Sequence, residues 1–76
     1  MKKIEFIIRT DLIRGKMAEK GYTIGRLAQE IPVSRKTLSD KLNSCSNEFK
    51  FWEMARIAEI LELDEPGRYF FAQKLA

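Results

Sequence analysis

The sequence contains no histidine and a single cysteine, Cys45, among its 76 residues. One cysteine cannot close an intramolecular disulfide, so a disulfide-stabilised scaffold is excluded and a reducing compartment is predicted. Without histidine, the usual zinc ligand and the usual general base of a catalytic triad are missing. A glycine-rich phosphate loop is absent as well. We therefore expect no metal, no cofactor and no enzymatic activity.

Long apolar runs are also missing. No segment approaches the roughly 20 apolar residues that a membrane helix requires. Glu5 and Arg9 interrupt the apolar stretch behind Lys2 and Lys3, and no small-residue cleavage site follows, so a signal peptide is not predicted. We expect a single globular domain over residues 1–76, located in the cytoplasm, with no membrane contact and no evident small-molecule ligand.

The charge is unevenly distributed. Residues 1–50 carry 11 basic and 6 acidic side chains, whereas residues 51–76 carry 3 basic and 5 acidic ones. A basic half beside a slightly acidic half predicts that one surface meets an anion. Ordinary solvated surface charge would explain the same numbers.

Hydrophobic spacing predicts a mainly α-helical fold with four or five helices. Ile4, Phe6 and Ile8 alternate as in a short strand within residues 3–9. Thr10 is a candidate N-cap and Gly21 a candidate C-terminal stop for a first helix. The predicted helices span residues 11–20, 24–31, 35–43 and 51–63, and a turn follows at Pro66 and Gly67. The predicted core consists of Leu12, Met17, Leu27, Ala28, Ile31, Leu38, Leu42, Ile57 and Leu61.

The second and third predicted helices lie only three residues apart. Thr23 and Ser34 are placed to cap them, and Pro32 ends the second helix. So short a connection makes two helices cross steeply, and the later one then projects from the domain. Arg35 and Lys36 would occupy its first turn, and a helix of this kind fits the major groove of duplex DNA.

The stretch from Thr23 to Asn43 resembles the Cro/repressor type of helix-turn-helix, the xenobiotic-response-element-like family that includes small phage Cro-like regulators. The matching features are Leu27-Ala28, Val33-Ser34 and Thr37-Leu38-Ser39, followed by Ile57-Ala58 and Leu61 in the next helix. The resemblance covers about residues 10–63, and the ending Tyr69-Phe70-Phe71 is similar to that of small Cro-like proteins. Two positions differ from the family: Pro32 stands where the family usually has glycine, and Ile24 stands where it often has glutamine.

The resemblance implies a lambda-repressor-like domain that binds a double-stranded DNA operator and regulates transcription in a bacterial cell, with the helix-turn-helix at about residues 23–43. Arg35 is the first choice for reading a base. Lys41, Asn43 and Ser44 suit phosphate contacts, and a plain solvated surface explains these three residues equally well. The candidate DNA-binding residues are Thr23, Ser34, Arg35, Lys36, Thr37, Ser39, Asp40, Lys41 and Asn43.

Two residues near this helix allow more than one interpretation. Asp40 could accept a hydrogen bond from cytosine, but it could also pair with Lys36 one turn earlier, and we favour the pairing. Cys45 has only Ser44 and Ser46 beside it, and neither carries a charge that would lower a thiol pKa. A redox switch at Cys45 is therefore unsupported.

The C-terminal part, residues 50–76, is predicted to form a homodimer. On a helical wheel, Phe51, Met54, Ala55, Ile57, Ala58 and Leu61 face the core. The apolar residues outside that arc, together with the aromatic tail, form the candidate interface: Trp52, Ile60, Leu63, Tyr69, Phe70 and Phe71. In the alternative, the tail folds back within a monomer and covers Trp52, with the strand at residues 4–8 as a possible support.

A second function class fits the same sequence. The helix-turn-helix could be vestigial, and the chain could act as a protein-interaction module of the antitoxin or anti-repressor kind through its apolar tail. Salt separates the two functions, because DNA binding weakens steeply with salt and an apolar interface does not. The operator, the direction of regulation, and a phage or chromosomal origin are not readable from the residues.

Overall fold

The computed structural model describes residues 4–43 and 49–75. Within them the chain is mainly α-helical, as expected, with five helices and a two-stranded sheet. The elements run in the order β1 (Ile4–Ile7), α1 (Thr10–Lys20), α2 (Ile24–Glu30), α3 (Arg35–Asn43), α4 (Phe51–Ile60), α5 (Pro66–Phe70) and β2 (Ala72–Leu75). Cys45, Ser44 and Ser46 lie outside the described residues, so the predictions about them stay predictions.

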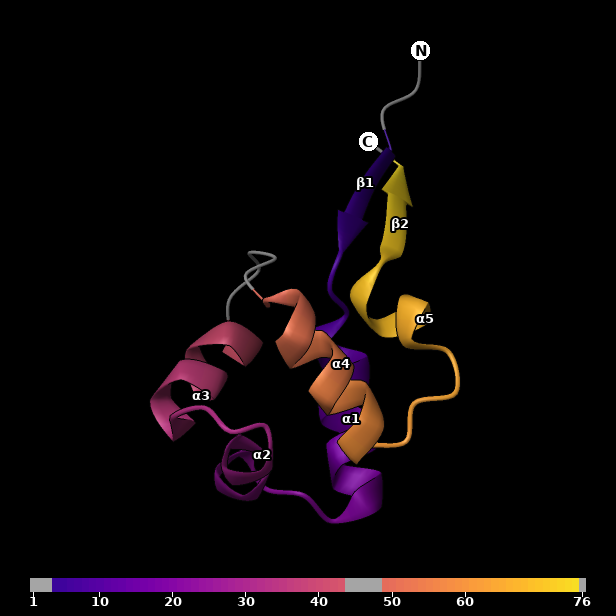
Figure 1. The fold of residues 1–76 in the computed structure, drawn as a ribbon. Helices are drawn as coiled ribbons and strands as arrows, with labels where there is room; N and C mark the ends of the chain where they lie inside the picture. Colours follow the sequence, from indigo (N-terminus) through magenta and orange to yellow (C-terminus); the bar gives the residue numbers. More distant parts are fainter. Residues whose placement is uncertain (1–3, 44–48, 76) are drawn as a thin grey trace.

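The helices enclose one core, and the two strands extend away from it as an antiparallel ribbon (Figure 1). The ribbon pairs the two ends of the described chain, with Phe6 opposite Gln73 and Ile7 opposite Ala72. Because of this extension the molecule measures 43 × 24 × 20 Å. The tail therefore folds back onto the first strand, as the monomeric alternative proposed, although Trp52 stays 47% exposed.

The core is built from helical stripes of the kind that the sequence predicts. Eight of the nine predicted core positions are buried. The exception is Leu12, which is half-buried, while its neighbour Ile13 is completely buried. Additional buried residues come from the chain around α4 and α5, and they are Phe49, Glu53, Leu63 and Phe70.

Three helix ends are predicted correctly, and at each of them a capping side chain begins the helix or a glycine ends it. The Thr23 hydroxyl oxygen accepts a hydrogen bond from Arg26 N at 3.1 Å, and Ser34 Oγ accepts one from Thr37 N at 3.0 Å. Gly21 ends α1 with φ of 75°, a left-handed conformation that glycine adopts without steric penalty. These three positions confirm the predicted C-terminal end of α1 and the predicted N-caps of α2 and α3.

Two helix ends differ from the expectation. Thr10 is the first residue of α1 rather than its N-cap, and Arg9 at the N-cap makes no side-chain capping bond. Helix α4 ends at Ile60 rather than at Leu63, because Glu62 adopts a left-handed φ of 54° and Leu63 N then donates to Ala58 O at 2.9 Å. This reversal turns Leu63 into the core.

Candidate nucleic-acid interface

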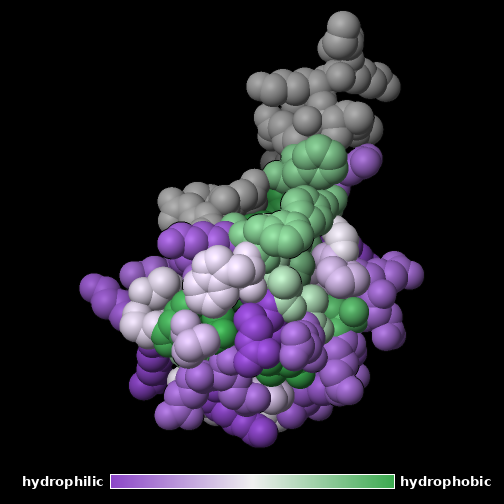
Figure 2. Space-filling model, in the orientation of Figure 1, coloured by the Kyte–Doolittle hydropathy of each residue, from purple (hydrophilic) through white to green (hydrophobic). Residues whose placement is uncertain are grey.

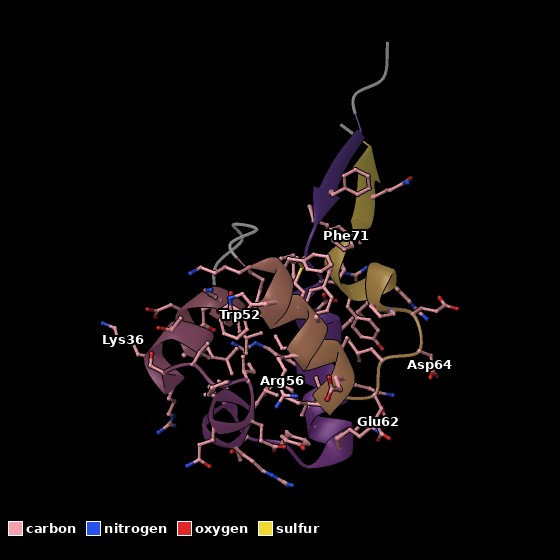
Figure 3. The ribbon with its side chains drawn as sticks, in the orientation of Figure 1. Lys36, Trp52, Arg56, Glu62, Asp64 and Phe71 are labelled. Carbon is pink, nitrogen blue, oxygen red and sulfur yellow. The ribbon has the colours of Figure 1, made fainter. Side chains whose placement is uncertain are left out.

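Helix α3 presents one side to the core and the other to solvent. Leu38 and Leu42, four residues apart, are 1% and 2% exposed and anchor the helix. Around them, Arg35, Lys36 and Thr37 in the first turn are exposed, as are Asp40 and Asn43 further along. Lys36 projects from the edge of the molecule away from α4 (Figure 3). Helix α3 therefore offers a continuous polar face from its first turn to its last.

The connection between α2 and α3 is held by backbone hydrogen bonds and by one arginine. Val33 N donates to Ala28 O at 2.8 Å, which folds the chain back under α2. From α4, the Arg56 guanidinium donates to Glu30 O at 2.7 Å and to Ile31 O at 3.2 Å. A cation at the carbonyl end of a helix is favourable, so Arg56 stabilises the end of α2 and fixes where α3 begins. Sequence reasoning missed Arg56, which lies 25 positions from Ile31.

Arg35 and Lys36 carry charge that the described protein does not neutralise. Neither side chain has an ion-pair or hydrogen-bond partner within residues 4–43 and 49–75. The Arg35 side chain lies against the start of α2, where a methyl group on Gly25 would come 3.8 Å from Arg35 Cδ. Two cations in the first turn of a helix face its positive dipole end, an arrangement that an anion would relieve.

The pairing of Lys36 with Asp40 that the sequence favoured is absent from the described part of the chain. Asp40 is exposed and, in that part of the chain, makes no side-chain hydrogen bond or ion pair. The weak order of the two charges, with lysine before the acid, provides little to hold them together. Asp40 is therefore available as a hydrogen-bond acceptor on the exposed face.

Lys41 is half-buried and pairs with an acidic side chain of α4. Lys41 Nζ lies 2.6 Å from Glu53 Oε1 on α4, and the two side chains are only 14% and 4% exposed. Glu53 Oε1 also accepts a hydrogen bond from Lys50 N at 2.7 Å. Because this buried pair occupies the ammonium group, the expectation that Lys41 contacts DNA is corrected.

A different cation stands at the end of α3. The Arg14 guanidinium, on α1, donates to Asn43 Oδ1, and both residues are exposed. Asn43 Nδ2 also lies 3.5 Å from Ser39 Oγ. Arg14 and Asn43 are 29 positions apart in the chain, so no local spacing could have indicated that Arg14 borders the candidate site.

At the start of α2 the charges are already balanced. The Arg26 guanidinium stacks on the Tyr22 ring at 4.3 Å and lies 3.5 Å from a Glu30 carboxylate oxygen. Thr23 uses its hydroxyl to cap the helix. The Thr23 hydroxyl is therefore already engaged. The exposed face of α3, in contrast, carries two cations, Arg35 and Lys36, without an acidic partner in the described protein.

Acidic residues gather on the other side of the molecule. Glu62 and Asp64 lie at the edge opposite Lys36 in Figure 3, and Glu59 and Glu65 are exposed on the same stretch of chain. Lys20 on α1 pairs with Glu62 at 2.7 Å. The uneven charge of the sequence thus becomes a difference between two surfaces, with α3 on the positive one.

The predicted dimer residues divide between core and surface. Leu63 and Phe70 are 8% and 3% exposed and belong to the core, and Ile60 and Tyr69 are half-buried against it. Only Trp52 and Phe71 remain exposed. Among the described residues, Phe51 is the large apolar side chain with the highest exposed fraction, 78%, although the helical wheel placed it toward the core. Within the first turn of α4 it is Glu53, not Phe51, that is buried, so the helical wheel places Phe51 on the wrong side of the helix.

Three further properties of the protein bear on its function: metal-ligating groups, membrane-spanning helices and similarity to known proteins. No group of metal-ligating side chains occurs within the described residues. None of the helices described is long and apolar enough to cross a membrane. Comparison with protein families, with curated proteins and with solved structures finds no match to this chain.

Proposed function

We propose that this protein binds double-stranded DNA in a sequence-specific manner, as a small transcriptional regulator of the Cro/repressor type, with α3 in the major groove. The observation that carries the proposal is the pair Arg35 and Lys36. Both are exposed in the first turn of a helix held from behind by two leucines, and neither has an acidic partner in the described protein. Such a helix can enter a groove about 12 Å wide and meet phosphates on both sides.

The residues on the α3 face suit two kinds of contact. Arg35 has the donor geometry for the O6 and N7 atoms of guanine, and Asp40 can accept from the N4 of cytosine. Lys36, Thr37 and Arg14 are placed for phosphates, which position the protein without reading sequence. In this assignment Arg14 replaces Lys41 as the cation near the end of the helix.

Selection of bound sites from random duplexes, followed by substitution, tests the proposal. Arg35→Ala is expected to weaken binding to the selected site about 5- to 150-fold and to relax the preference at one base pair. Arg68→Ala is the matched control, since Arg68 is an exposed arginine on α5 without a side-chain partner in the described protein. Equal losses on selected and random DNA would show that Arg35 does not read a base.

Salt dependence separates this function from a protein-interaction module. Affinity for DNA is expected to fall linearly on a log–log plot against salt, with a slope that becomes shallower in Lys36→Ala. The Arg68→Ala slope is expected to match that of the wild type. If no duplex from the random pool binds above background at low salt, the DNA-binding proposal is wrong.

A further inference from the structure

Helix α4 contacts both α2 and α3 through two charged side chains that lie one turn apart. Glu53 and Arg56 are separated by three positions, which places them on the same face of α4. Glu53 pairs with Lys41 in the last turn of α3, and the Arg56 guanidinium reaches the connection between α2 and α3. In Figure 3, Arg56 lies between α4 and α2. One face of α4 therefore meets the chain just before α3 and again near the end of α3.

The connection between α2 and α3 depends on hydrogen-bond donors from outside it. The last carbonyl groups of a helix have no partner within the helix, and Pro32 has no N–H group to offer them. Arg56 Nη2 donates to Glu30 O at 2.7 Å, and Arg56 Nε donates to Ile31 O at 3.2 Å. Arg56 thus supplies donors at the point where the backbone of Pro32 has none.

The Arg56 guanidinium is fixed in orientation as well as in place. On one edge, its Nε and Nη2 atoms donate to two successive carbonyl groups, and its Nη1 atom lies 3.1 Å from Glu59 Oε1. A planar group held by three of its nitrogen atoms resists rotation, whereas the ammonium group of a lysine is a single point whose donors turn freely. The arginine therefore restrains both the distance and the angle between α4 and the end of α2.

Directional contacts complement the apolar anchor of α3. Leu38 and Leu42 bury one side of the helix, but apolar contact is non-directional and tolerates a tilt. Hydrogen bonds weaken steeply when their angle changes. On the face shown in Figure 2, the surface over α2 is mainly hydrophilic, and hydrophobic surface gathers on the ribbon and the adjoining part of the body. Polar contacts before the first turn of α3 and in its last turn therefore restrict its tilt.

We propose that Arg56 is a positioning residue for DNA recognition, which sets the angle at which α3 enters the major groove. The proposal rests on the function proposed above. Arg35 follows Ile31 by four positions, so a change at the connection displaces the Arg35 side chain relative to the bases. Glu53 restrains the far end of α3 through Lys41, and two restrained points define the direction of a helix. Arg56 itself contacts neither a base nor a phosphate.

A change in the angle of α3 affects the two kinds of DNA contact differently. A bidentate contact from Arg35 to guanine needs two donor–acceptor distances of about 3 Å and two nearly straight angles at once. A phosphate contact from Lys36 needs only one such distance, and a lysine side chain turns freely to keep it. Loss of the Arg56 hydrogen bonds is therefore expected to weaken binding to the selected site more than binding to random DNA.

Binding of Arg56→Met to the selected duplex and to random DNA tests the positioning role. The ratio of the two affinities is expected to fall about tenfold, while the salt slope stays that of the wild type. Arg68→Met is the matched control, because it removes one positive charge at an exposed position without a side-chain partner in the described protein, and it is expected to keep the ratio. Arg56→Lys keeps the charge but not the paired donors, so its ratio is expected to fall as well.

A charge-neutral double variant tests the other end of α3. Lys41→Met combined with Glu53→Gln removes the ion pair and keeps the net charge of the protein, so affinity for random DNA is expected to stay within about twofold of the wild type. The ratio of selected to random affinity is expected to fall, because the last turn of α3 is no longer tied to α4. Circular dichroism identifies a variant that fails to fold, and Arg56→Lys decides if Arg56→Met is that variant.

Three results would overturn the positioning role. Equal losses on selected and random DNA indicate that the substitution only lowers the folded fraction. A shallower salt slope in Arg56→Met than in Arg68→Met indicates that Arg56 contacts a phosphate directly. An unchanged ratio in the Arg56 variants or in the double variant shows that the polar contacts with α4 do not set the angle of α3.

Residual dipolar couplings of the free protein separate this inference from the DNA-binding function. The couplings report the angle between α3 and α1 without DNA, and this angle is expected to change in Arg56→Met and to stay the same in Arg68→Met. If the angle changes but the wild type selects no duplex, the function is wrong and the hold of α4 on α3 stands. If the wild type selects a duplex and the angle does not change, only the positioning role is wrong.

Discussion

At the scale of single residues, position in the fold decides what a charge does. Lys36 and Lys41 are five positions apart on α3, yet one is exposed and unpaired in the described protein and the other is half-buried in an ion pair with the buried Glu53. Removing one partner of a buried ion pair leaves the other charge uncompensated and lowers the free energy of unfolding, whereas removing an exposed charge changes that free energy little. The two lysines thus separate a structural role from a candidate binding role.

Lys41→Met is expected to lower the free energy of unfolding by about 3 kcal/mol or more, because it leaves the Glu53 carboxylate buried and unpaired. Lys36→Met, the control on the same helix, is expected to change it by less than about 0.5 kcal/mol. Adding Glu53→Gln to Lys41→Met removes the charge and keeps an acceptor for Lys50 N, so most of the loss is expected to be regained. Urea unfolding measures all three variants, and a Lys41→Met protein as stable as wild type would contradict the buried pair.

At the scale of helices and strands, local signals set the ends of α1, α2 and α3. Helix α1 contains one glycine in its interior and is followed by another that ends it. Gly21 ends it in the left-handed region, whereas Gly15 lies inside the helix with ordinary φ and open space where a side chain would be. A glycine-to-alanine substitution is therefore expected to change the stability of the protein in opposite directions at the two positions.

Gly21→Ala is expected to destabilise the protein by about 1 kcal/mol, because alanine is strained at a φ of 75°. Gly15→Ala is expected to stabilise it by up to about 1 kcal/mol through the higher helix propensity of alanine. Thermal or urea unfolding of the two variants side by side measures the difference. Two changes of the same sign would contradict the assigned end of α1.

At the scale of the whole molecule, an ion pair joins the ends of two helices that are far apart in sequence. Lys20 at the end of α1 pairs with Glu62 after α4, across 42 positions. The hydrogen bond from Lys20 holds the pKa of Glu62 below its usual range, and the same bond raises the pKa of Lys20. A carboxyl group with a lowered pKa stabilises the fold above its unfolded pKa and loses that contribution as the pH falls through the folded value.

The free energy of unfolding is therefore expected to fall as the pH drops from 7 to below about 4, the ordinary range of a glutamate. Part of that fall comes from Glu62, so Glu62→Gln is expected to show a shallower dependence and to converge with the wild type at low pH. Urea unfolding at several pH values measures both curves. If the unfolding free energies of the two proteins stay a constant distance apart down to the lowest pH, Glu62 does not contribute to the pH dependence. Glu65→Gln is a control for the loss of one exposed acid, because the Glu65 side chain has no hydrogen-bond or ion-pair partner in the described protein.

Features that depend on near neighbours in the chain were predictable from the residues alone. The caps at Thr23 and Ser34 and the stop at Gly21 each require one residue and the backbone beside it. The spacing of Leu38 and Leu42 selects the buried side of α3, and most of the core follows from such stripes. For the same reason the exposed face of α3, with Arg35 and Lys36, was predictable.

The contacts between residues far apart in sequence follow from the packed fold and not from local patterns. The pairing of β1 with β2, the contact of Arg56 with the end of α2 and the ion pair of Lys41 with Glu53 all join parts of the chain that no local pattern links. The same holds for the candidate interface. Phe51 and Leu63 are both apolar and near the ends of one helix, yet the core lies beside only one of them. Burial depends on where neighbouring elements stop, and that is a property of the packed molecule.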